Sequence, residues 1–145
     1  MYIATKKDRA AVSRFARLMD LYEANYINMR LLLPALDQLQ GDCVSRVNGC
    51  LDLHIRVIEK SPYTSTLNLT YVFTDGNRGQ YEPDLYVRVY HDARQAEVVS
   101  GLLHGQRHVK RCSRSLEGSW KLNRFLYKWL RYCLRRGHKV HATTH

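Results

Sequence analysis

The chain has 145 residues, 45% of them hydrophobic, so it is long enough to bury one core without disulfides or metals. No segment approaches the roughly 20 apolar residues of a membrane-spanning helix, and the first residues lack the apolar core of a signal peptide. We therefore expect a cytoplasmic protein of one domain, residues 1–145, with mobile ends at about 1–7 and 139–145. The four cysteines form no CxxC pair, which predicts reduced thiols.

The positive charge is concentrated in the last third of the chain. The net charge is +10, from 23 Lys and Arg against 13 Asp and Glu. Residues 1–93 carry 11 charges of each sign, whereas residues 94–145 carry 12 cations against only Glu97 and Glu117. Such an asymmetry indicates an anionic partner.

A long helix is predicted over residues 9–32, with Asp8 as its N-cap. Apolar side chains recur at steps of three and four residues and define one face: Phe15, Leu18, Met19, Tyr22, Tyr26, Met29 and Leu33. Pro34 lacks a backbone donor and disfavours helix at the preceding residue, so the element should end there. A break between Asp20 and Asn25 would be compatible with this pattern.

The middle of the chain shows the period-two alternation of half-buried strands. Apolar and polar residues alternate over 51–57, 67–73 and 85–90, and a turn near 92–94 leads into a fourth strand at about 96–103. A short edge strand is expected at 44–47. The turn residues 75–79, together with Pro83, should close the loop before the third strand. Short connections favour an antiparallel meander of four to five strands with one face in water.

The last helix is predicted over residues 120–136, between Ser119 as N-cap and Gly137 just beyond its end. Its apolar positions form one stripe: Leu122, Phe125, Leu126, Trp129, Leu130, Cys133 and Leu134. Five cations form a second stripe on nearly the opposite side: Lys121, Arg124, Lys128, Arg131 and Arg135. The predicted fold class is therefore α+β, with an N-terminal helical segment, the meander, and this amphipathic helix packed on the sheet.

Five blocks of the chain resemble a known family. They read LMDLYEANY at 18–26, RLLLP at 30–34, PYTSTL at 62–67, VRVYHDA at 87–93 with AEV at 96–98, and NRFL at 123–126 followed by WLRYCL at 129–134. In this order they resemble the YqiB-like family of small uncharacterised bacterial proteins, a family defined by a domain of unknown function. The resemblance covers the chain from about residue 14 to residue 138. It implies a bacterial cytoplasmic protein, but it implies no particular activity, because the family has no established function.

The five-cation stripe is the first candidate site. Like charges at these spacings repel by about a few tenths of a kcal/mol per pair, and a face that is merely solvated more often mixes signs. We therefore predict an anion- or nucleic-acid-binding surface for RNA, DNA or an acidic protein. Four upstream cations would extend it if they lie nearby: Arg107, Lys110, Arg111 and Arg114. The alternative is a basic face that only confers solubility, since no RNP signature, GXXG loop or zinc-finger spacing is present.

The second candidate is the strand face that carries Tyr86, Arg88 and Tyr90. Two phenols around a guanidinium could bind a planar or phosphorylated ligand, or a protein partner of an interaction module or regulator. If they are instead structural, Glu97 across the hairpin is the natural partner of Arg88.

Enzymatic chemistry is less favoured. A small phosphohydrolase would need His91, Asp92 and Glu97 together, but adjacent residues of a strand point to opposite faces, and a turn would make Asp92 a backbone cap. The chain has no G-x-S-x-G elbow and no phosphate-cradling glycine loop, and Cys50 and Cys133 are expected to be buried and inert. The spacing of His104, His108 and Cys112 is interrupted by Gly105, and His138, His141 and His145 lie in the tail. We predict no catalytic residue, metal site or cofactor, and expect a non-enzymatic binding protein.

Overall fold

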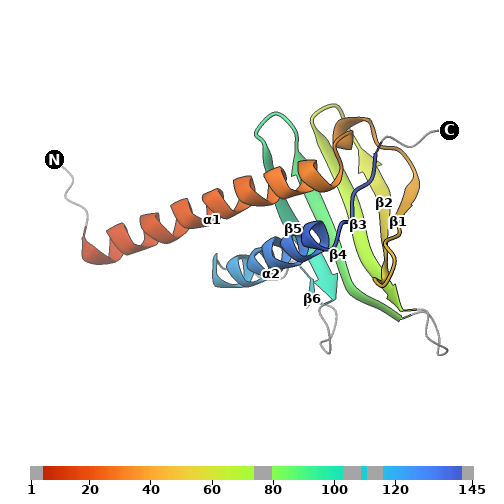
Figure 1. Cartoon of the computed structure of the whole chain (residues 1–145). Helices are drawn as coiled ribbons and strands as arrows, with labels where there is room; N and C mark the ends of the chain where they lie inside the picture. The colour runs from red at the N-terminus through yellow and green to blue at the C-terminus, as the bar shows by residue number, and fades with distance from the viewer. Residues whose placement is uncertain (1–4, 74–79, 103–108, 111–115, 142–145) are drawn as a thin grey trace.

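The computed structural model describes residues 5–73, 80–102, 109–110 and 116–141, which form two layers, helices on one side and an antiparallel sheet on the other (Figure 1). In chain order the elements are α1 (Lys6–Leu32), the 3-10 turn η1 (Leu36–Gln38), β1 (Asp42–Ser45), β2 (Asp52–Lys60), β3 (Thr64–Phe73), β4 (Gln80–Tyr90), β5 (Gln95–Leu102), β6 (Val109–Lys110) and α2 (Leu116–Arg135). The predicted α+β class and its helix, meander and helix order are confirmed.

The sheet is a simple meander, in which each strand pairs antiparallel with the next in sequence, from β1 to β6. The sheet has six strands, one more than the predicted four to five, because the two-residue β6 pairs with β5. Pro83 lies inside β4 rather than in a closing loop, where the register between β3 and β4 shifts. A proline is tolerated at such a bulge because no ladder N–H is needed there. The turn residues 75–79 lie outside the described residues.

Helix α1 begins one turn earlier than its sequence pattern indicates. Thr5 is the N-cap, and Asp8 lies in the first turn: the Asp8 N–H donates to Thr5 Oγ1 (3.1 Å), while the Thr5 N–H donates to Asp8 Oδ2 (3.2 Å). The expectation that Asp8 itself is the N-cap is therefore wrong, because this reciprocal capping box satisfies two donors at once. The helix continues unbroken to Leu32 and ends before Pro34, as predicted.

The N-terminal part of α1 projects beyond the sheet (Figure 1). Leu18 is the first buried residue of this helix, and Phe15, although it belongs to the predicted apolar face, is 52% exposed. Phe15 is thus only half covered, although its neighbours Arg14 and Arg17 share a groove with α2. The rest of the apolar face, from Leu18 to Leu33, is buried or half-buried.

Helix α2 starts about one turn before the predicted cap, so Ser119 lies inside it. Its end agrees with the sequence pattern: Gly137 has φ +96°, its N–H donates to Leu134 O (3.1 Å), and the His138 N–H donates to Cys133 O (3.0 Å). This is a Schellman motif, which favours glycine at that position.

The chain beyond α2 returns to the body of the protein. His138 is buried with its Nδ1 2.8 Å from Ser45 Oγ, and the Val140 N–H donates to Leu32 O (2.9 Å). The Lys139 N–H donates to Ser45 Oγ (3.3 Å), so this segment is bonded both to β1 and to the end of α1.

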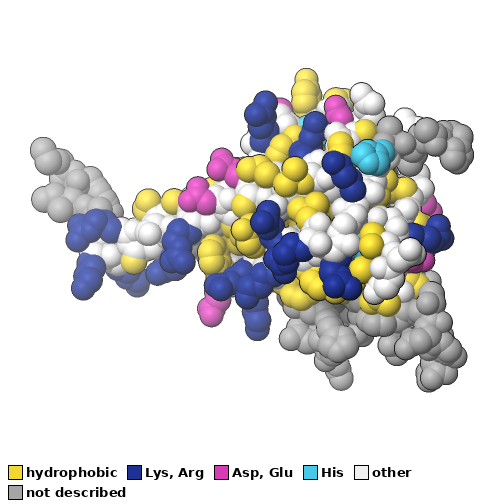
Figure 2. Space-filling model, in the orientation of Figure 1, with side chains coloured by type: hydrophobic (Ala, Val, Ile, Leu, Met, Phe, Trp, Pro, Cys, Tyr) yellow, Lys and Arg dark blue, Asp and Glu magenta, His cyan; other side chains and the backbone are white. Residues whose placement is uncertain are grey.

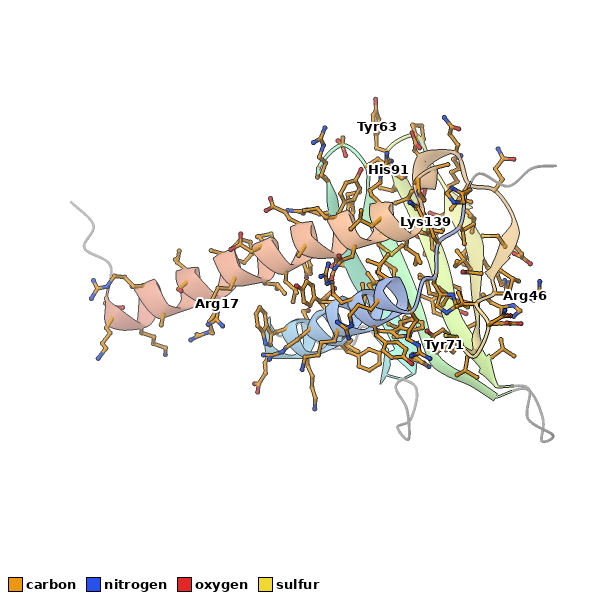
Figure 3. All side chains as sticks on the ribbon, in the orientation of Figure 1. Arg17, Arg46, Tyr63, Tyr71, His91 and Lys139 are labelled. Atoms are coloured by element: carbon orange, nitrogen blue, oxygen red, sulfur yellow. The ribbon has the colours of Figure 1, made fainter. Side chains whose placement is uncertain are left out.

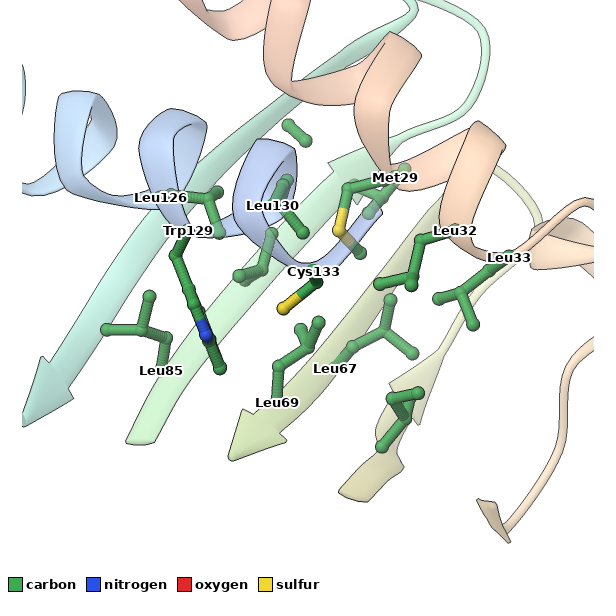
Figure 4. Packing of buried hydrophobic residues seen from close by; sticks show 14 of the residues in the cluster. Met29, Leu32, Leu33, Leu67, Leu69, Leu85, Leu126, Trp129, Leu130 and Cys133 are labelled. Carbon is green, nitrogen blue, oxygen red and sulfur yellow. The ribbon is translucent and has the colours of Figure 1, made fainter. Parts of the chain in front are cut away.

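The core lies between the helices and one face of the sheet (Figure 4). Leu126 and Leu130 of α2 are at most 1% exposed and lie over Leu69 and Leu85 of the sheet. Burying each such leucine contributes about 1.5–3 kcal/mol. Trp129 stacks edge-on against Tyr71, with ring centroids 5.4 Å apart. The apolar stripe predicted for the last helix is therefore the face that closes the core.

A buried polar junction joins both helices to the sheet. In β5 the pairing with β4 passes from Ser100 to Val98, so Val99 is the extra residue of a bulge. The Val98 N–H donates to Oδ1 of Asn123 in α2 (2.9 Å), and Nδ2 of Asn123 donates to Ser119 O (2.8 Å). Nδ2 of Asn25 in α1 donates to the backbone oxygen of Asn123 (3.3 Å).

We expect Asn123→Ala to lower the free energy of unfolding by about 1–3 kcal/mol, because it leaves the buried Val98 N–H without an acceptor. The matched control is Arg124→Ala at the neighbouring exposed position, which should stay within about 0.5 kcal/mol of wild type. Urea denaturation followed by circular dichroism measures both. An Asn123→Ala protein as stable as the Arg124→Ala protein would contradict this account of the junction.

Candidate anion-binding surface

The five-cation stripe of α2 points away from the core. All five side chains are exposed: Lys121, Arg124, Lys128, Arg131 and Arg135. At 1.5 Å per residue, the stripe extends over about 21 Å. None of the five forms a salt bridge with a described residue; the ion pairs found there belong to Arg30, Arg46 and Arg56. The stripe is therefore a row of solvated charges that no described carboxylate pairs with, and the nearest acid of the same helix is Glu117, one turn before Lys121.

Of the four upstream cations that the sequence adds to this surface, one lies in a described element. Arg107, Arg111 and Arg114 lie outside the described residues. Lys110 lies in β6, opposite Ser100 of β5.

Helix α1 adds cations that the sequence analysis missed. Lys6, Lys7, Arg14 and Arg17 are exposed on its projecting half, and Figure 2 shows Lys and Arg side chains both there and over α2. The signal was present as helically spaced cations near the N-terminus. It was hidden because residues 1–93 sum to zero charge and because sequence alone does not place α1 beside α2.

A groove connects the two helices. It encloses about 570 Å³ and is lined by Arg14, Arg17 and Leu18 of α1 and by Glu117 and Trp120 of α2. The Arg17 guanidinium lies 5.3 Å from the centre of the Trp120 ring, a cation–π contact. The cationic side of α1 thus meets the start of α2 at the Trp120 indole, with the carboxylate of Glu117 in the same groove.

The second predicted set lies on the face of the sheet that carries no helix among the described residues. Arg88 stands opposite Glu97 in register, and the Tyr90 hydroxyl donates to Glu97 Oε1 (2.7 Å). Partial burial and the neighbouring Glu97 raise the pKa of Tyr90. Tyr86 shares this face, since Leu85, Val87 and Val89 between these residues are buried. These contacts tie Tyr90 and Glu97 into a polar network on the outer face.

His91 lies on the other side of the sheet, toward α1. Its Nε2 is 2.8 Å from Oγ of Ser65, which is buried on the core side. Asp92 is exposed and its Oδ1 accepts from the Ala93 N–H (2.9 Å), as a turn cap does. His91, Asp92 and Glu97 therefore do not converge, and the arrangement that a phosphohydrolase would need at these residues is absent.

The described residues offer little to nucleophilic or metal chemistry. Cys133 is 1% exposed, and burial raises the pKa of its thiol to about 11. Cys50, expected to be buried, is only half-buried, because it lies in a loop beside Arg136, whose Nε donates to its Sγ (3.3 Å). Within residues 5–73, 80–102, 109–110 and 116–141, no three His, Cys, Asp or Glu side chains are placed to hold a metal ion. His104, His108, Cys112 and His145 lie outside those ranges.

Fold and surface together define a two-layer α+β protein with a cationic helical face, which consists of the five-cation stripe of α2 and the exposed Lys6, Lys7, Arg14 and Arg17 of α1. The chain belongs to the family described as "Protein of unknown function (DUF1249)", which matches residues 28–139 and so includes the sheet and α2. It is 30% identical over 128 residues to the "Uncharacterized protein YqiB" of Escherichia coli strain K12, covering 85% of this chain and 90% of that protein. The YqiB proteins of strains O157:H7 and CFT073 show the same identity and coverage. No solved structure matches the chain. Neither described helix is apolar enough over its length to cross a membrane.

The thiol of Cys133 should be protected in the folded protein. In a Cys43→Ser/Cys50→Ser/Cys112→Ser variant, we expect Ellman's reagent at pH 8 to react with Cys133 slowly while the protein is folded. Burial and the raised pKa both keep the thiolate scarce. The reaction should become fast once urea unfolds the chain. Equal rates in both states would show that Cys133 is accessible.

Proposed function

We propose that the protein acts in the bacterial cytoplasm as a non-enzymatic binding protein whose cationic helical face engages an anionic polymer, single-stranded RNA. The observation that carries this proposal is the row of five exposed cations on α2 without a salt-bridge partner among the described residues. In the free protein these cations repel one another, and an anionic chain bound along them would relieve this repulsion.

The shape of the surface favours a polymer over a small ligand. The stripe is about 21 Å long and lies on the outside of a helix, so its charges cannot converge on one small anion. A chain of phosphates can contact them one after another. Each phosphate that a cation neutralises releases counterions, which gives binding that weakens steeply with salt.

Aromatic side chains favour a single strand over a duplex. Trp120 lines the groove between the helices, and Tyr127 and Tyr132 are exposed on α2 beside the stripe. Unpaired bases stack on such rings without sequence preference, whereas paired bases are already stacked on each other. A cationic track flanked by aromatic side chains is how proteins commonly hold single strands.

A second candidate function is an interaction module that uses the outer face of the sheet. It is supported by Tyr86, Arg88 and Tyr90, which are partly exposed on a face without a described helix. The hydrogen bond from Tyr90 to Glu97 occupies two of the polar groups that a ligand would use, so we rank this function second.

The test of RNA binding is fluorescence anisotropy of a labelled single-stranded RNA at about 50 and 200 mM salt, where counterion release is visible. We expect wild-type binding to weaken with salt, with a log–log slope of about −3.5 if all five stripe cations contact phosphates. Arg124→Gln/Lys128→Gln/Arg131→Gln should weaken binding at low salt and make the slope shallower by about 2, since three contacts are lost.

A matched control separates the stripe from net charge. Arg46→Gln/Arg56→Gln/Lys60→Gln also removes three positive charges, but from exposed positions in and beside β1 and β2. This variant should bind almost as wild type does. Equal weakening by both triple variants would mean that overall charge alone acts. No binding at low salt, or binding insensitive to salt, would overturn the proposal and favour the outer face of the sheet.

A further inference from the structure

A second hollow lies on the opposite side of α1 from Arg17. It encloses about 380 Å³ and is lined by Tyr26 and Arg30 of α1, Asp37 of η1, and His91 and Arg94 of the turn between β4 and β5. Figure 3 shows His91 and Arg17 on different sides of the α1 ribbon. We call this hollow the His91 pocket. Three segments far apart in sequence build it, and it is separate from the cationic helical face.

The charges of the His91 pocket favour an anion. Arg30 and Arg94 bring two guanidinium groups, against the single carboxylate of Asp37. The Arg30–Asp37 ion pair is long, 3.7 Å, and both side chains are well exposed, so Asp37 leaves much of the Arg30 guanidinium available. Arg94 forms no salt bridge with a described residue.

Arg94, which lines the His91 pocket, has a backbone conformation that is unfavourable for a residue with a side chain. Arg94 has φ +56°, and it is the one described residue other than glycine with a positive φ. Glycine or asparagine adopts this left-handed conformation readily, whereas a long side chain does so at a cost. Such strain in a short turn is typical of positions where the side chain has a task.

The His91 ring is fixed and has a spare hydrogen-bonding atom. Its backbone N–H donates to Tyr63 O (2.8 Å), and its Nε2 is 2.8 Å from Ser65 Oγ. Nδ1 is shielded from solvent and has no partner among the described residues. Whichever way the proton lies between Nε2 and Ser65, Nδ1 can make one more hydrogen bond.

We infer that the His91 pocket binds the phosphate group of a small anionic metabolite. Arg30 and Arg94 supply bidentate donors, for which phosphate oxygens are well matched acceptors. Tyr26 and His91 line the pocket and complete its polar wall. Asp37 competes with the ligand for Arg30 and limits the affinity. This site is independent of the proposed RNA-binding surface, which lies along α2 and the other side of α1.

The experiment is a titration of the full-length ¹⁵N-labelled protein with inorganic phosphate at constant ionic strength, followed by amide chemical shifts. We expect saturable shifts in the β4–β5 turn and near Arg30. Arg94→Gly and Arg30→Gln should each weaken binding about tenfold or more, since each removes charge-assisted hydrogen bonds. Asp37→Asn should strengthen binding several-fold, which a merely destabilising change would not do.

Two controls keep the result clear. Arg94→Gly relieves the strained turn, so its melting temperature should equal or exceed that of wild type while binding falls. The Arg124→Gln/Lys128→Gln/Arg131→Gln variant should bind phosphate at this site as wild type does, whatever happens to RNA binding. Shifts confined to α2, shifts that do not saturate, or unchanged affinity in Arg94→Gly would each overturn the inference.

Discussion

The arrangement of this protein depends on the buried junction around Asn123. A bulge in β5 interrupts the ladder with β4, and the Val98 N–H is satisfied by an amide from α2 rather than by another strand. Asn25 of α1, which is fully buried, reaches the same residue of α2. Apolar burial is not directional, so it does not by itself specify one crossing point. The directional hydrogen bonds fix where each helix crosses it.

The position of α2 determines which of its two faces meets solvent. Its buried leucines and Trp129 pack in the core over β3 and β4, so the cations on the opposite side of the helix point toward solvent. Helix α1 is longer than the layer it packs on, so its N-terminal part projects, with Arg14 and Arg17 beside the start of α2. The cationic helical face results from these two constraints together. The His91 pocket arises from the other side of α1, where that helix crosses the β4–β5 turn.

Much of the fold was predictable because local signals agree with the tertiary structure. Alternation located the strands, Pro34 the end of α1, and Gly137 the end of α2. The misjudged helix starts, at Thr5 rather than Asp8 and before Ser119, arose because several residues with capping side chains lie close together. Only backbone geometry shows which of them stands outside the first turn. The exposure of Phe15 was not predictable, because periodicity defines a face without showing how far a neighbour covers it.

The sequence by itself determined the fold class, the strand order of a short-looped meander, and the amphipathic division of α2 into apolar and cationic sides. These properties follow from neighbours within a few residues, which helix and strand geometry places on known sides. Only the tertiary structure decided that Arg17 meets Trp120, and that His91 turns toward Arg30 while Glu97 faces away. Such contacts join residues far apart in the chain. Their positions depend on where a bulge, a turn and a helix crossing fall, and no local pattern records that.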